Sequence, residues 1–181
     1  MARLVTRTPF TLASGTWLPQ RRTLADFQLQ DTNGHAFDRA SLRGTPTLLY
    51  FGYTACPDVC PTMLAELAQV QRRRPLPGAR VLFVTVDPER DSIAGLRAYL
   101  GLFSPNFIGL RGDQAALEPL LKSLDAVAVR QPLPGGGYTM DHSATLYLLD
   151  RRGRLAAVFS PPFTVAQLGA DLDHIARSDL L

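Results

Sequence analysis

Apolar and polar positions along the chain follow two different periods. Residues 47–53 and 81–86 are nearly unbroken runs of apolar and β-favouring residues, the pattern of strands covered on both faces of a sheet. Residues 62–74 follow the first run and place their apolar side chains at the spacing of one helix face. The two patterns in succession predict an α/β protein with a strand, a helix and a second strand at its centre.

The chain before this centre divides into two parts. Residues 1–22 contain proline, arginine and serine without sustained periodicity, and we expect them to form a flexible N-terminal arm. Asn33-Gly34 is a strong hairpin-turn pair between the short segments 27–29 and 36–37. A small N-terminal β-hairpin is therefore expected to precede the main fold.

Capping residues mark the starts of the remaining helices. Ser92 and Asp113 each precede a helical pattern and can accept hydrogen bonds from its first amides. Pro119 is expected to kink or shorten the second of these helices, because proline has no amide proton to donate. Thr164 and Gln167 have the spacing of a capping box and predict the final helix.

The remaining strands are predicted in the last third of the chain. Residues 132–137 are rich in proline and glycine and are expected to form a loop. Residues 144–149 then return to a strand pattern, and a turn leads into another strand at 155–159. The predicted order is hairpin, β, α, β, α, α, β, β, α. This order, with two cysteines where the first central strand meets its helix, indicates a thioredoxin-like fold with a mixed sheet flanked by helices, in one domain over residues 23–181.

Charge and hydropathy exclude two classes of protein. The net charge is +3, and basic clusters such as Arg21-Arg22 and Arg151-Arg152 are scattered rather than interleaved with aromatic residues, so we expect no nucleic-acid binding. No apolar run approaches the roughly 20 residues needed to cross a bilayer, and no signal peptide is recognisable. The chemistry must then be sought in individual side chains.

The only two cysteines, Cys56 and Cys60, stand four residues apart at the predicted start of a helix. At this spacing both thiols lie on one face of the first turn, where the helix dipole is expected to favour the thiolate. A structural disulfide would close a very short loop and stabilise the fold little. A structural zinc site is disfavoured, because it would need four protein ligands and the chain offers two cysteines and at most one nearby histidine. A reversible disulfide and a soft metal such as Cu(I) both remain open.

Three histidines could complete a metal site. His35 is expected on the surface of the hairpin and His174 on the polar face of the final helix. His142 follows the glycine-rich loop and precedes a buried strand, from where it could reach the cysteines. Ligand sites in such sheets lie at the carboxyl ends of strands, where Cys56, Asp87 and the segment before Ala144 should gather.

Three motifs in this order resemble the Sco/SenC family of copper chaperones for cytochrome c oxidase assembly. The first is Phe51-Gly52-Tyr53-Thr54 leading into Cys56-Pro57-Asp58-Val59-Cys60-Pro61, the second is Val84-Thr85-Val86-Asp87-Pro88-Glu89-Arg90-Asp91, and the third is Asp141-His142-Ser143-Ala144. The resemblance covers about residues 24–175. It implies copper bound by Cys56, Cys60 and His142, with Cu(I) expected and Cu(II) left open.

The resemblance also implies partners and a location. The expected partner is the cytochrome c oxidase subunit with the dinuclear copper centre, to which this protein would deliver copper or whose thiols it would reduce. Another periplasmic copper chaperone or a thiol reductant is a further candidate. The family is anchored on the periplasmic side of a bacterial inner membrane by an amino-terminal segment that this chain lacks, so we expect a processed or shortened form. Ala55 departs from the bulkier residue usual in the family, and Ser143 matches the family where thioredoxins have a cis-proline.

Nearby side chains and rival activities complete the expectations. Asp87 and Arg90 are candidates to support the ligands, and loop salt bridging is an equal alternative for both. Met140 is expected to pack rather than ligate, and Met63 to lie in the core. The main rival function is a metal-free thiol-disulfide oxidoreductase acting through Cys56 and Cys60, although thioredoxins have two intervening residues rather than three. A peroxiredoxin-like peroxidase is disfavoured, because Tyr53 stands where threonine or serine is usual.

Overall fold

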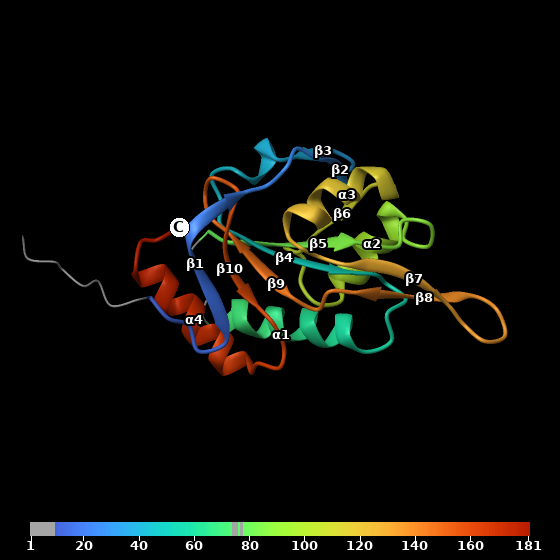
Figure 1. Cartoon of the computed structure of the whole chain (residues 1–181). Helices are drawn as coiled ribbons and strands as arrows, with labels where there is room; N and C mark the ends of the chain where they lie inside the picture. The colour runs from blue at the N-terminus through green and yellow to red at the C-terminus, as the bar shows by residue number, and fades with distance from the viewer. Residues whose placement is uncertain (1–9, 74–75, 77) are drawn as a thin grey trace, which may run out of the picture.

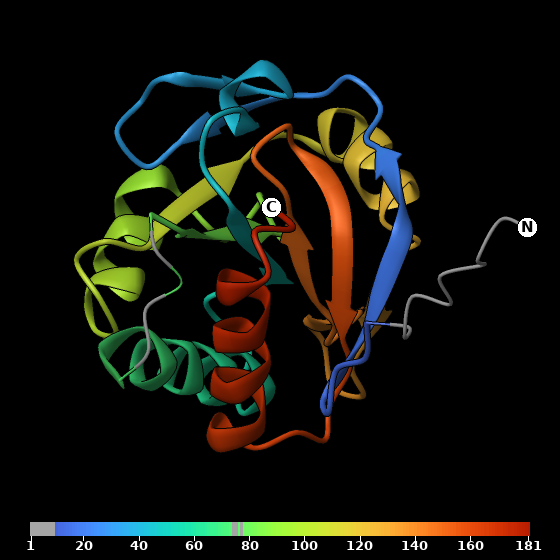
Figure 2. The same cartoon turned by 90° about the vertical axis from the view of Figure 1, so that its left-hand side faces the viewer.

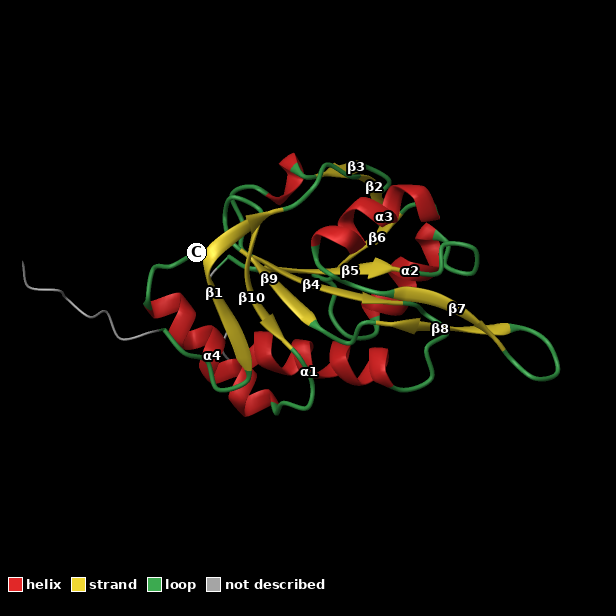
Figure 3. Ribbon diagram, viewed as in Figure 1, coloured by secondary structure: helices red, strands yellow, loops and turns green. Residues whose placement is uncertain are grey.

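The computed structural model describes residues 10–73, 76 and 78–181. Its elements, in chain order, are β1 (Gly15–Thr23), β2 (Gln28–Asp31), β3 (Ala36–Asp38), β4 (Thr47–Gly52), α1 (Val59–Arg73), β5 (Arg80–Thr85), α2 (Ile93–Gly101), β6 (Ile108–Arg111), α3 (Gln114–Ser123), β7 (Ala128–Pro132), β8 (Tyr138–His142), β9 (Leu146–Leu149), β10 (Arg154–Phe159) and α4 (Val165–Arg177). A single 3₁₀ turn at Ala40–Leu42 joins β3 to β4. Figure 1 labels these elements and Figure 3 colours them by type.

Eight strands form one mixed sheet in the order β1-β10-β9-β4-β5-β6-β2-β3. Strands β4, β5 and β6 are parallel. On the other side of β4, β9 runs antiparallel to β4 and β10 runs antiparallel to β9. Strands β7 and β8 form a separate antiparallel pair that projects from the body of the molecule (Figure 3). The mixed sheet with helices around it confirms the expected thioredoxin-like α/β architecture.

Helices cover both faces of the large sheet, so its central strands are buried. Helices α1 and α2 lie on the same face, as right-handed crossovers between the parallel strands β4, β5 and β6 require. Helix α4 packs beside α1 on that face, and α3 lies on the other (Figure 2). All six residues of β4 are buried, which explains its continuous apolar sequence. Strand β4 therefore ends in the middle of the fold, and the segment that connects it to α1 begins there.

The capping residues perform their predicted roles. Ser92 accepts a hydrogen bond from the amide of Gly95 and Asp113 from the amide of Ala116. Thr164 and Gln167 form the complete capping box at the start of α4. The hairpin around Asn33-Gly34 is also present, with β2 and β3 antiparallel. Pro119 lies inside α3, which ends four residues later at Ser123.

Three parts of the fold were not predicted. Most of the expected arm is ordered, because Gly15–Thr23 form β1, which pairs with β10. The amides of Ala13 and Ser14, just before this strand, donate hydrogen bonds to the carboxylate of Asp171. Residues 1–9, and Arg74 at the expected end of the first helix, lie outside the described residues. Strand β6 and the β7–β8 pair were missed, and His142 lies in β8 rather than in a loop. No helix among the described residues has both the length and the apolar character to span a membrane.

Candidate metal centre

The two cysteines lie where β4 ends and α1 begins. Cys56 is in the connecting loop and Cys60 in the first turn of α1, and both side chains are buried. The amide of Cys60 donates to the Cys56 sulfur, at 3.4 Å. Gly52 permits this packing, because a Cβ there would lie 2.9 Å from the Cys60 sulfur and 2.7 Å from the ring of Phe83. Both cysteines are free thiols.

His142 reaches the cysteines from the β7–β8 pair, which lies over the amino-terminal end of α1 in Figure 1. Its Nε2 atom is 3.3 Å from the Cys60 sulfur, and its Nδ1 atom is 3.1 Å from the carbonyl oxygen of Ser143. A carbonyl can only accept, so Nδ1 carries the proton and Nε2 offers its lone pair to the thiol. The candidate ligand atoms of Cys56, Cys60 and His142 all lie within 4.8 Å of one another.

Burial sets the protonation of this group. Removal from water raises the pKa of the Cys60 thiol, and the neighbouring side chain of Cys56 raises it further. Removal from water also lowers the pKa of His142, so the imidazole is neutral near pH 7. At Cys60 this loss of hydration opposes the expected preference of the helix dipole for the thiolate and favours the protonated thiol in the metal-free protein.

Asp91 holds the cysteine loop against the end of β5. Its carboxylate is buried and accepts from the amide of Thr54 at 3.1 Å and from the hydroxyl of Thr54 at 2.5 Å. It also accepts from the hydroxyl of Thr85 at 2.5 Å. Because Thr54 precedes Cys56 by two residues, Asp91 fixes the loop from which the first sulfur projects.

Asp87 and Arg90, the predicted supporting residues, hold the histidine side of the site. Asp87 is buried, accepts from the Tyr138 hydroxyl at 2.8 Å and pairs with Arg90. Arg90 donates to the carbonyl oxygen of Tyr138 at 3.0 Å and stacks 3.9 Å above its ring. Since Tyr138 begins β8, this ion pair fastens the strand that carries His142. The loop after β5 thus contacts both sides of the cluster: its Asp91 holds the cysteine loop, and its Asp87 holds the strand that carries His142.

Among the described residues, His35, His174, Met63 and Met140 are not part of the group formed by Cys56, Cys60 and His142. His35 is exposed, 3.6 Å from Asp31, and His174 packs against the ring of Phe10. Met63 is buried in α1, and Met140 is buried on β8, where it lines a hollow beside Arg130. These four interpretations agree with their sequence-based expectations.

Several residues around the cluster were not predicted. Asp91 was part of a quoted motif without an assigned role, and its spacing from Asp87, with both on the loop after β5, was the available signal. Tyr138 stood beside the glycine-rich loop, but only the pairing of β7 with β8 shows that it faces Asp87. Tyr50 appeared as one apolar residue of a buried strand, and nothing in the pattern indicated that its ring lies beside His142.

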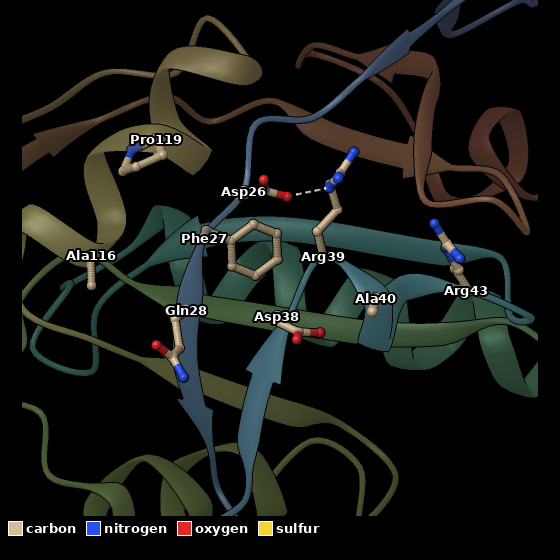
Figure 4. A pocket seen from close by; sticks show the side chains of 9 residues that line it. All are labelled: Asp26, Phe27, Gln28, Asp38, Arg39, Ala40, Arg43, Ala116 and Pro119. Carbon is tan, nitrogen blue, oxygen red and sulfur yellow. Dashed lines mark ion pairs between the residues drawn. The ribbon is translucent and has the colours of Figure 1, made fainter.

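A second hollow, of about 660 Å³, lies near β2 and β3, away from the cysteines (Figure 4). Asp26 and Arg39 face each other at its rim, 2.7 Å apart, in an exposed ion pair. It is lined by no cysteine or histidine. Exposed ion pairs of this kind are weak and common, so this hollow does not compete with the cysteine cluster as a functional site.

Comparison with known proteins places this cluster in a family. The family model SCO1/SenC matches residues 17–177. The chain belongs to the SCO1/SenC family. A Stutzerimonas stutzeri protein is 33% identical over 165 residues, which are 90% of this chain and 81% of that protein. The bovine protein "SCO2 homolog, mitochondrial" is 36% identical over 148 residues, 79% of this chain but only 56% of its own length.

A solved structure of the SCO1/SenC family gives the same overall arrangement. Bradyrhizobium japonicum ScoI, determined with copper bound, superposes with a TM-score of 0.74 and is 42% identical. The match covers 83% of this chain and 98% of that one. The family named from three sequence motifs is thereby confirmed.

Proposed function

We propose that this protein binds Cu(I) through Cys56, Cys60 and His142. The observation that carries the proposal is that two sulfurs and one imidazole nitrogen lie within 4.8 Å of one another. Two thiolates and a neutral imidazole are a soft donor set, which suits Cu(I) better than a hard cation. The fixed tautomer of His142 also leaves Nε2 free to bind without losing a proton.

The biological role that fits this site is copper delivery. We infer that the protein supplies copper to the dinuclear copper centre of cytochrome c oxidase, or prepares the cysteines of that centre. The support is the resemblance of three motifs to the chaperone family, and the copper bound by the Bradyrhizobium japonicum relative. The inferred partner is the oxidase subunit that holds this centre, on the periplasmic side of a bacterial inner membrane.

Metal content of the reduced protein tests the binding proposal. One Cu(I) per chain is expected for the wild type, with strongly weakened binding in Cys56→Ala, Cys60→Ala and His142→Ala. His35→Ala is the matched control, because His35 is exposed and remote from the sulfurs, and it should bind like the wild type. Equally tight binding after loss of either cysteine would refute the assignment.

A second candidate is thiol-disulfide exchange without copper. The observation in its favour is that two free thiols lie side by side, with the Cys60 amide bonded to the Cys56 sulfur. Exchange needs the sulfurs alone, whereas the copper site also needs the imidazole. His142→Ala cells should therefore lose oxidase copper as severely as Cys56→Ala cells if delivery is the task. A normal oxidase in His142→Ala cells alone would favour thiol reduction.

A further inference from the structure

Two buried hydroxyl groups lie beneath the cysteine cluster without hydrogen-bond partners. Among the described residues, the buried side-chain oxygen and nitrogen atoms that lack any partner are the hydroxyls of Tyr50 and Tyr99. Tyr50 is in β4 and is 0% exposed, and Tyr99 is in α2. Buried hydroxyls are normally paired, because an unpaired one loses its hydration without compensation. Phenylalanine at either position would avoid this loss.

Both hydroxyls lie close to the sulfur atoms. Burial raises the pKa of the Tyr50 hydroxyl, and the neighbouring Cys60 and Cys56 sulfurs raise it further. The hydroxyl lies near enough to Cys60 to act on it as a hydrogen-bonding group, although the two form no hydrogen bond of ordinary distance and angle. Tyr99 interacts with the same two sulfurs. The Tyr50 ring also packs edge-on against the imidazole of His142, with centroids 6.1 Å apart. Tyr50 therefore lies beside the imidazole ligand, on the buried side of the cluster.

The metal-free site offers these hydroxyls only a weak acceptor. The Cys60 sulfur already contacts Nε2 of His142 at 3.3 Å, and a neutral thiol sulfur accepts hydrogen bonds poorly. Metal binding requires a thiolate, which is a strong, charged acceptor. An O–H group beside that sulfur then gains a charge-assisted bond in surroundings from which water is excluded. The orphaned hydroxyl is thus complementary to the loaded site rather than to the empty one.

We propose that Tyr50 is a positioning residue of the metal site, whose hydroxyl donates a hydrogen bond to the Cys60 sulfur when that sulfur binds the metal. The proposal deepens the Cu(I) site proposed above and rests on it. It makes Tyr50 a determinant of copper affinity that never touches the metal.

Tyr50→Phe separates this role from a structural one. Cu(I) affinity, measured by competition with a chelator on reduced protein, should fall about tenfold to a hundredfold. The melting temperature of the metal-free variant should be equal to or above that of the wild type, because an unpaired buried hydroxyl has been removed. A variant that merely damaged the core would lose both quantities together.

Nuclear magnetic resonance with ring-labelled tyrosine supplies a direct signature, because Cu(I) is diamagnetic. The signal assigned to Tyr50 by its absence in Tyr50→Phe should shift on loading with Cu(I), as its hydroxyl becomes a donor. Tyr147→Phe is the matched control. Tyr147 is equally buried, but its ring packs against Phe51 and its hydroxyl faces Ser143 and Thr145 rather than the sulfurs, so this variant should bind Cu(I) like the wild type.

The possible failures are distinguishable. If wild-type protein takes up no Cu(I), the proposed function is wrong and this inference falls with it. If the wild type binds Cu(I) and Tyr50→Phe binds it equally tightly, or if the Tyr50 signal does not move on loading, the copper site stands and the role of Tyr50 is refuted. Loss of affinity in Tyr147→Phe equal to that in Tyr50→Phe would also refute it, because the effect would then not depend on proximity to sulfur.

Discussion

Replacing Asp91 by asparagine should loosen the cysteine loop without changing the size of the side chain. The carboxylate receives three close hydrogen bonds, from the amide and hydroxyl of Thr54 and from the hydroxyl of Thr85. Asparagine keeps one acceptor oxygen, but its NH₂ group would meet the Thr54 amide, which is also a donor. Asp91 is 1% exposed, so water cannot replace the lost partner.

The magnitude follows from these contacts. A hydrogen bond to a charged group contributes about 1.5–3 kcal/mol, and the remaining bonds weaken when the charge is lost. We expect Asp91→Asn to lower the free energy of unfolding by about 2–4 kcal/mol. For a domain of this size, that corresponds to a melting temperature roughly 5–15 °C lower. Cu(I) affinity should fall as well, by about tenfold, because Thr54 no longer holds the loop that presents Cys56.

Thermal unfolding of the reduced, metal-free protein, followed by circular dichroism, measures the first effect. Asp113→Asn is the matched control: it makes the same chemical change at the exposed N-cap of α3, where asparagine caps as well as aspartate. The control should unfold within about 0.5 kcal/mol of the wild type. If Asp91→Asn did the same, the carboxylate contacts would not hold the loop, and the account of the site given above would be wrong.

Three further outcomes are expected. Burial raises the pKa of Cys60, so its proton must leave when Cu(I) binds, and affinity measured by competition should rise about tenfold per pH unit for each proton released; a flat profile between about pH 6 and 8 would contradict this. Oxidation should join Cys56 to Cys60 and abolish Cu(I) binding, because the disulfide no longer offers thiolates; copper retained by fully oxidised protein, quantified by mass spectrometry, would argue against the ligand assignment. Gly52→Ala should cost about 1–3 kcal/mol in urea unfolding, because the new methyl group overlaps Phe83 and the Cys60 sulfur; an unchanged midpoint would show that the packing is looser than described.

Strong local signals made much of the fold predictable. Buried strands such as β4 have continuous apolar sequences, and the caps at Ser92 and Thr164 use residues whose side chains form the bonds themselves. Strands β7 and β8 gave no such signal, because β7 is largely exposed and β8 mixes buried, half-buried and exposed positions without a continuous apolar run. The glycine loop between them was recognised as a loop only, although Gly135, Gly136 and Gly137 all adopt positive φ and allow the tight reversal of a hairpin.

The sequence predicted which residues form the site better than it predicted their protonation and their supporting contacts. Cys56 and Cys60 are recognisable by their spacing, but 82 residues separate Cys60 from His142. Position alone made His142 one possible ligand, and the family motif then singled it out. Protonation could not be inferred correctly from position, because the helix dipole is a local property whereas burial depends on the whole fold. The supporting contacts of Asp91 and the orphaned hydroxyl of Tyr50 likewise depend on which strands become neighbours.

The two outermost strands of the eight-stranded sheet, β1 and β3, bear on how this molecule behaves in a crowded solution. An unpaired strand edge is a template on which another chain can extend the sheet. Strand β3 has only three residues, and β1 contains Pro19 and Arg21 within a break of register between Trp17 and Arg22. A missing amide, a charged side chain and an irregular edge each oppose regular pairing. Both outer edges of the large sheet therefore disfavour edge-to-edge pairing with another chain, the first step toward fibrous aggregates.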